Sequence, residues 1–113
     1  MANVLLINND SDTWEQLVDT SRACGFKVDS LHCLEVNADS GDGYDIVILS
    51  GGWWYNQAAK HTEVYKGELE LIRKTTTPVL GICIGMQLMQ IAYSGSVPLL
   101  DEPQKKLADY NDY

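Results

Sequence analysis

With 113 residues, 45% of them hydrophobic and 21% charged, the chain has the size and composition of one globular domain, and a second does not fit. Sixteen acidic against eight basic residues give a formal net charge of −8, which argues against binding to nucleic acids or anionic membranes. The three cysteines are odd in number and show no C-x-x-C spacing, so neither a disulfide framework nor a metal site is expected, and we expect no cofactor. The N-terminus has no basic leader and no long apolar run occurs, which predicts a cytoplasmic protein.

The first predicted elements are a strand and a helix. Residues 4–7 form a continuous apolar run, typical of a parallel strand that is covered on both faces. Asp12 and Glu15 have the spacing of a capping box, so a helix should begin at this point. Gly25 is expected to end that helix, because glycine readily adopts the left-handed conformation found there.

A second strand, a loop and a third strand follow. Residues 26–31 alternate apolar and polar side chains, which predicts a strand near the edge of the sheet. Residues 32–43 contain Asp-Ser-Gly-Asp-Gly and should form a loop. The apolar strand 45–49 ends in Ser-Gly-Gly at 50–52, where backbone amides can approach a ligand without side chains in the way.

Residues 53–55, Trp-Trp-Tyr, come directly after the glycine pair. They could form an apolar wall of a pocket, or anchor this loop to the core or to a partner protein. A second helix is expected over residues 62–74, because Tyr65, Leu69 and Ile72 repeat at helical spacing.

Residues 78–88 read as a short buried strand, a tight turn and a helix. Gly81 and Gly85 flank Cys83 in a G-x-C-x-G pattern, the cysteine counterpart of the nucleophile elbow. The helix that follows should direct unpaired backbone amides and its positive dipole end at the sulfur, which favours a thiolate and can receive an oxyanion. By itself, the pattern fits an ordinary buried cysteine equally well.

The order of elements predicts the fold. Strands alternating with helices indicate a three-layer α/β domain with a flavodoxin-like parallel sheet of strand order 2-1-3-4 and helices on both faces. The third and fourth strands are neighbours in that order. We therefore expect the glycine pair and Cys83 to meet at the carboxyl edge of the sheet, where such folds bind ligands.

These motifs resemble those of the class I glutamine amidotransferases. In that family a strand ends in Ser-Gly-Gly and is followed later by Pro-Val-Leu-Gly-Ile-Cys-x-Gly-x-Gln, as at residues 50–52 and 78–87 here. Residues 4–11 resemble the family's first strand and turn. The resemblance covers residues 2 to about 97, which places a partial domain at residues 1–97 and leaves 98–113 as an acidic tail that is expected to be frayed or docked on a partner.

The resemblance implies a chemistry. Cys83 would attack the side-chain amide of glutamine, form a glutamyl thioester and release ammonia for a synthetase. Backbone amides of Gly52 and Ile84 would hold the oxyanion. Gly51, Gly52 and Gln87 would bind glutamine, although Gln87 could instead cap or line its helix.

One part of the family's machinery is missing from these residues. The family's general base, a histidine with a glutamate two residues on, lies far beyond the cysteine, and here no histidine follows Cys83. His32 and His61 occupy no catalytic position of the family and are expected at the surface. We therefore predict little or no glutaminase activity from these residues alone.

Several interpretations stay open. The chain is either part of an amidotransferase that a further segment or a second chain completes, or a non-catalytic glutamine-binding or assembly module. A γ-glutamyl hydrolase or a DJ-1-like protein is a weaker alternative, since these share the elbow or the sheet. An incomplete sheet would also leave an uncovered edge, which predicts homo-oligomers.

Overall fold

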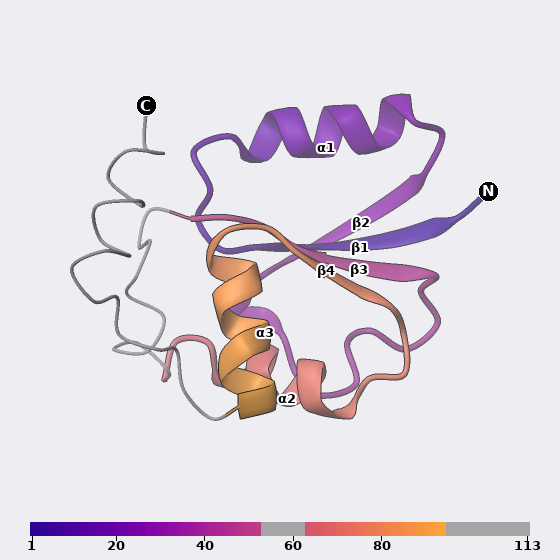
Figure 1. Cartoon of the computed structure of the whole chain (residues 1–113). Helices are drawn as coiled ribbons and strands as arrows, with labels where there is room; N and C mark the ends of the chain where they lie inside the picture. The colour runs from indigo at the N-terminus through magenta and orange to yellow at the C-terminus, as the bar shows by residue number, and fades with distance from the viewer. Residues whose placement is uncertain (53–62, 95–113) are drawn as a thin grey trace.

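The structure, a computed structural model, describes residues 1–52 and 63–94. Within these ranges, four parallel strands alternate with three α-helices, and a short 3-10 helix follows the second strand (Figure 1). The elements are β1 (Asn3–Asn8), α1 (Trp14–Ala23), β2 (Lys27–His32), η1 (Cys33–Glu35), β3 (Ile46–Leu49), α2 (Lys66–Lys74), β4 (Val79–Gly81) and α3 (Ile84–Ser94).

The strands form one sheet in the order β2-β1-β3-β4, which confirms the predicted flavodoxin-like topology. β2 lies at an edge, as its alternating sequence indicated. In the β3–β4 pair Leu49 is the partner of Gly81, so both strands end at the same level of the sheet. The residues that follow them, Ser50 and Ile82, therefore leave the sheet side by side.

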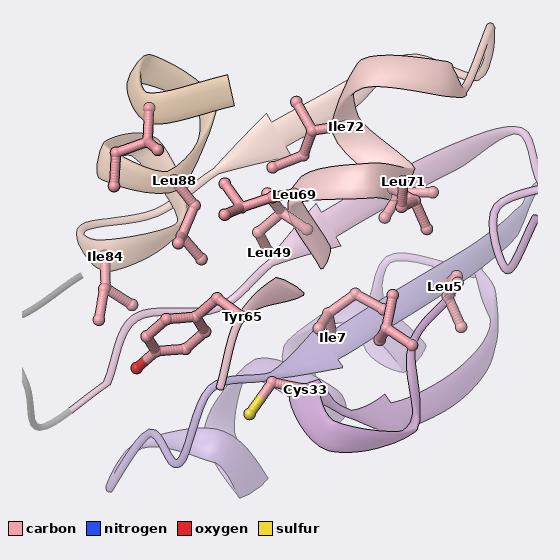
Figure 2. Packing of buried hydrophobic residues seen from close by; sticks show 13 residues of the cluster. Leu5, Ile7, Cys33, Leu49, Tyr65, Leu69, Leu71, Ile72, Ile84 and Leu88 are labelled. Carbon is pink, nitrogen blue, oxygen red and sulfur yellow. The ribbon is translucent and has the colours of Figure 1, made fainter. Parts of the chain in front are cut away.

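Helices cover both faces of the sheet, α1 on one and α2 with α3 on the other (Figure 1). Side chains of β1 alternate between the two resulting cores, which is why its sequence is apolar without interruption. The core under α1 is built on Val4, Leu6 and Ile48. The larger core lies under α2 and α3 (Figure 2) and consists of Leu5, Ile7, Cys33, Val36, Val47, Leu49, Tyr65, Leu69, Leu71, Ile72, Ile84, Leu88 and Ile91.

The start of α1 differs from the prediction. Its N-cap residue is Thr13, which makes no side-chain capping bond, so the capping box of Asp12 and Glu15 is wrong. The side chain of Asn8 organises this turn instead, because its Oδ1 accepts the backbone amides of Asp10 and Ser11 at 2.9 and 3.3 Å. Ser11 Oγ in turn accepts the backbone amide of Thr13 at 3.2 Å, so the turn continues past Asp12 and the first helical residue is Trp14.

Two glycines of the helices are required by their positions. Gly25 ends α1 with a φ of +90°, as predicted. Gly67 lies within α2, where an added Cβ would overlap the carbonyl oxygen of Val36. The helix can therefore pack this closely on the chain that follows η1 only with glycine at this position. The predicted helix over 62–74 is shorter in the structure, because residues 63–65 form a turn.

Three predictions fall outside the described residues, namely the role of residues 53–55, that of His61 and the domain boundary before the tail at 98–113. They stay predictions. None of the helices in the described part of the chain is long and apolar enough to cross a bilayer.

Candidate active site

Cys83 occupies the corner between β4 and α3 in a left-handed backbone conformation, with a φ of +52°. A non-glycine residue seldom adopts this conformation, which here turns the chain sharply from strand to helix. Its side chain is exposed and its thiol is free, which contradicts the alternative of an ordinary buried cysteine.

The two flanking glycines make this corner sterically feasible. A Cβ on Gly81 would lie 2.7 Å from the carbonyl carbon of Gly85, and one on Gly85 would lie 2.5 Å from the carbonyl oxygen of Leu49. Real Cβ atoms do not approach other atoms so closely. The turn therefore packs backbone against backbone, both within itself and against the end of β3.

The glycine pair after β3 lies next to Cys83. A Cβ built on Gly51 would be 3.4 Å from Cβ and 3.8 Å from Sγ of Cys83, so the backbone of Gly51 lies beside the thiol. A Cβ on Gly52 would overlap the carbonyl oxygen of Asn9. The structure thus brings together the two motifs that the sequence analysis singled out.

A pocket of about 390 Å³ opens beside Cys83, between the sheet edge and α1. This is within the usual size range of small-molecule sites. The sheet side consists of Ser50, Gly51, Gly52, Ile82 and Cys83. The opposite wall, which the sequence analysis missed, comes from α1 and the turn before it and is mostly polar: Ser11, Asp12, Thr13, Gln16, Leu17 and Thr20.

Two of the predicted site residues lie on α3 and do not line this pocket. The side chain of Ile84 is fully buried, so only its backbone amide could serve an oxyanion. Gln87 is 7% exposed, and its backbone amide donates to the carbonyl oxygen of Cys83 at 3.1 Å. This bond belongs to the first turn of α3. A contact between the Gln87 side chain and glutamine stays a prediction.

His32 lies at the far side of the sheet from Cys83. It ends β2, and β1 and β3 separate that strand from β4. Since neighbouring strands are about 4.8 Å apart, roughly 14 Å separate β2 from β4. His32 therefore cannot act as the base for Cys83.

The ring of His32 is engaged in local hydrogen bonds instead. Its Nδ1 accepts the backbone amide of Leu34 at 3.2 Å, so Nε2 carries the proton and donates it to Asp10 at 2.8 Å. Cys33 completes a set of three possible metal ligands whose ligand atoms lie within 4.8 Å of one another. Burial, and next the charges of Glu68 and Asp10, raise the pKa of the Cys33 thiol to about 11. The thiol is thus protonated, and both ring nitrogens of His32 are already hydrogen-bonded. These residues therefore form a hydrogen-bonded cap at the start of η1.

A buried polar cluster lies beneath the glycine pair, and the sequence analysis missed it. It consists of Asn9 at the end of β1, Ser50 after β3 and Glu68 on α2, all at most 1% exposed. The sequence contains a pattern from which the burial of Glu68 could have been predicted. It follows Tyr65 by three residues, which places a carboxyl group on the apolar face of the helix.

Comparison with known protein families identifies the family of this chain. The model of the family described as glutamine amidotransferase class-I matches residues 5–109. The chain belongs to the class I glutamine amidotransferases. This confirms the family that the Ser-Gly-Gly and G-x-C-x-G motifs predicted.

Individual amidotransferases match over shorter stretches. The chain is 45% identical over 47 residues to imidazole glycerol phosphate synthase subunit HisH of Yersinia pseudotuberculosis, which is 37% of this chain and 24% of that protein. It is 42% identical over 59 residues to HisH of Pectobacterium atrosepticum, 48% of this chain and 30% of that protein. The chain thus matches about a quarter to a third of the length of these curated relatives.

A solved structure supports the fold alone. A putative GMP synthase component from Thermoplasma acidophilum superposes with a TM-score of 0.71 at 20% sequence identity, over 82% of this chain and 45% of that one.

Proposed function

We propose that this chain carries the nucleophile of a glutamine amidotransferase, in which Cys83 removes the side-chain amide of glutamine. The observation that carries the proposal is the exposed Cys83 at a φ of +52°, with the backbone of Gly51 beside its sulfur. An exposed nucleophile next to side-chain-free backbone is the arrangement that attack on a planar amide requires.

The proposed reaction begins with attack of the Cys83 thiolate on the amide carbon. The oxyanion that forms accepts hydrogen bonds from the backbone amides of Gly52 and Ile84, and one such donor is worth about 3 kcal/mol of barrier. The carbon–nitrogen bond then breaks, the nitrogen takes up a proton and leaves as ammonia, and a glutamyl thioester remains. Water releases glutamate from that thioester.

The pocket supports this assignment of the substrate. Its sheet side presents Gly51, Gly52 and Cys83 to the amide end of glutamine. On the opposite wall, Ser11 and Thr13 offer hydroxyl groups that could contact the charged α-amino and α-carboxylate groups. Gln87 remains the proposed contact from α3. The chemistry calls for no metal or cofactor.

We propose further that these residues alone turn glutamine over slowly. No histidine follows Cys83 in the sequence, and His32 is separated from it by two strands. Losing a general acid–base group typically lowers a rate 10²- to 10⁴-fold. A further segment or a second chain would have to supply this group.

The edge of the sheet supports such a partner. Within the described residues β4 pairs with β3 alone, and the nearby Leu80 and Met86 are 50% and 59% exposed. A completing chain, a synthetase or a second copy of the chain could cover this surface. The HisH relatives are themselves named as parts of a synthase, which supports delivery of ammonia to a synthetase. We place the protein in the cytoplasm, because a reducing compartment suits its free thiols.

The distance from Cys83 to His32 favours one second candidate. A chain with the pocket and with no histidine near Cys83 among its described residues could bind glutamine without hydrolysing it, as a binding or assembly module. The two functions make different demands on Cys83, since only the first requires a reactive thiolate.

A diazo ketone analogue of glutamine tests the proposal. Cys24 is also exposed and free, so it serves as an internal control for general thiol reactivity, and Cys33 is buried. We expect mass spectrometry to find one label on Cys83 and none on Cys24, whereas iodoacetamide should label both. Equal labelling of both cysteines would contradict the proposal. No labelling of folded protein would favour the binding module.

A further inference from the structure

Hydrogen bonds connect the side chain of Glu68, through the side-chain amide of Asn9, to the backbone of Ser50 under the pocket. Oε1 of Glu68 accepts one N–H of the Asn9 side-chain amide at 2.9 Å. The same Nδ2 donates its other hydrogen to the carbonyl oxygen of Ser50 at 3.0 Å. Both hydrogens of Asn9 Nδ2 are thus used, one toward α2 and one toward the strand end that carries the glycine pair.

Asn9 also contacts the rest of the Ser-Gly-Gly turn. Its backbone amide donates to Ser50 Oγ at 2.8 Å, and that hydroxyl donates to the carbonyl oxygen of Gly51 at 2.8 Å. Its carbonyl oxygen lies so close to Gly52 that no Cβ fits there. The position of Asn9 therefore fixes the position of the whole turn, and Gly51 in turn lies against Cys83.

Two buried acceptors of this cluster have no hydrogen-bond partner among the described residues, namely Asn9 Oδ1 and Glu68 Oε2. Two buried acceptors left unpaired are costly. A single proton on Glu68 changes this. A protonated carboxyl group and a primary amide are complementary, so the carboxyl O–H can donate to Asn9 Oδ1 while Oε1 keeps the N–H of Nδ2.

We propose that Glu68 is a positioning residue whose neutral carboxyl group forms a two-bond pair with the amide of Asn9 and so holds the Ser50–Gly52 turn against Cys83. The catalytic part of this inference rests on the proposed function, because it assigns an oxyanion role to the turn. The pair itself does not depend on that function.

The surroundings of Glu68 favour the neutral form. Burial raises its pKa to about 7, and the hydrogen bond from Asn9 only partly opposes this shift. Glu68 interacts electrostatically with Cys33 of η1 and with Tyr65, the N-cap residue of α2, and Asp10 acts on the same two groups; none of the three is cationic. Burial, followed by Cys33, Glu68 and Asp10, also raises the pKa of Tyr65 to about 12. Within the described residues, Lys74 pairs with Asp39 and the ring of His32 bonds to Asp10, so neither basic side chain pairs with Glu68.

Nuclear magnetic resonance tests the pair independently of any chemistry at Cys83. The backbone amide signals of Gly51 and Gly52 are followed from pH 5.5 to 8.5 in wild type, Glu68→Gln and Glu70→Gln. Glutamine mimics the neutral acid, because its Nε2 can donate to Asn9 Oδ1 at every pH. Glu70 is exposed on the same helix and provides the matched control.

We expect both glycine signals to titrate with a midpoint near pH 7 in wild type and in Glu70→Gln, and to stay constant in Glu68→Gln. Signals that do not move with pH in wild type, or that titrate equally in Glu68→Gln, would overturn the proposal.

Two alkylating reagents then test the effect on the site. A glutamine-like chloroketone reacts with its carbonyl oxygen in the oxyanion position, while iodoacetamide needs no such site. With both, the sulfur–carbon bond forms as the halide leaves. We therefore divide the rate of Cys83 alkylation by the chloroketone by its rate with iodoacetamide. The fraction of Cys83 present as thiolate cancels in this ratio, which depends on how well the turn holds the oxyanion position.

In wild type this ratio should fall at least about fivefold between pH 6 and 8.5, a fraction of the 10²- to 10³-fold effect of losing a whole oxyanion donor. In Glu68→Gln it should stay constant. A constant ratio in wild type, with glycine signals that do titrate, would leave the pair intact and overturn its role in positioning. Failure of the chloroketone to react with any variant would overturn both this role and the proposed function, while the glycine signals would still decide whether the pair exists.

Discussion

Replacing Glu68 by Gln should remove a pH-dependent part of the protein's stability. The ordinary pKa of a glutamate carboxyl group is 4.5, and burial raises that of Glu68 to about 7 in the folded state. Between these values the folded chain binds more protons than the unfolded chain. The free energy of unfolding therefore falls as the pH rises from about 4.5 to about 7, and changes little above that range on account of this group.

The size of the effect follows from the same two values. They differ by roughly 2.5 pH units, and each unit corresponds to about 1.4 kcal/mol, so full ionisation of Glu68 costs about 3–4 kcal/mol. The side chain is 0% exposed, so solvent does not screen this cost. Because a domain of this size is stable by only about 5–15 kcal/mol, the loss is a large part of the total.

Urea unfolding between pH 5 and pH 8 measures this directly. Comparing each variant with wild type at the same pH cancels the titration of all other groups. Glu68→Gln should match wild type near pH 5 and exceed its unfolding free energy by up to about 3 kcal/mol at pH 8. The exposed Glu70→Gln should follow wild type throughout. A difference between Glu68→Gln and wild type that does not vary with pH would refute the reasoning.

Three further variants test the turn, the corner and the sheet edge. Ser50→Ala leaves the buried backbone amide of Asn9 without its acceptor, so the unfolding free energy should drop by about 1–3 kcal/mol. A drop no larger than that caused by Ser30→Ala, at an exposed position, would contradict this. Gly85→Ala places a Cβ 2.5 Å from the Leu49 carbonyl oxygen and should cost about 1–3 kcal/mol in urea unfolding, whereas exposed Met86→Ala should cost under about 0.5. Leu80→Lys combined with Met86→Lys should abolish self-association in light scattering, whereas Leu34→Lys, at an exposed position of η1, should not. A wild-type protein that is monomeric at high concentration would contradict the proposal that this surface mediates self-association.

The sequence was sufficient for the sheet order and for the juxtaposition of Gly51 with Cys83. Both follow from local patterns, since an uninterrupted apolar strand, a glycine pair and a G-x-C-x-G corner each specify backbone geometry within a few residues. Parallel strands with right-handed crossovers then leave few topologies. Parallel pairing does the rest, because it places the carboxyl ends of β3 and β4 at the same edge of the sheet.

Features that depend on the packing of distant side chains could not be read from the sequence. The capping box of Asp12 failed because Asn8, four residues earlier, binds the amides of the turn. The polar wall of the pocket depends on where α1 lies over the sheet edge. Helical spacing places Glu68 on a buried face, but only the fold shows that the side chain of Asn9 meets it there.

The central claim is that Cys83 is a nucleophile with main-chain donors beside it, and a γ-glutamyl thiophenyl ester tests this most directly. Its leaving group departs without a proton, so the reaction does not require a general acid. We predict a burst of one thiophenol per chain and a glutamyl adduct on Cys83, with neither in Cys83→Ala. A folded protein that shows no burst, or that acylates Cys24 as readily as Cys83, would contradict the account.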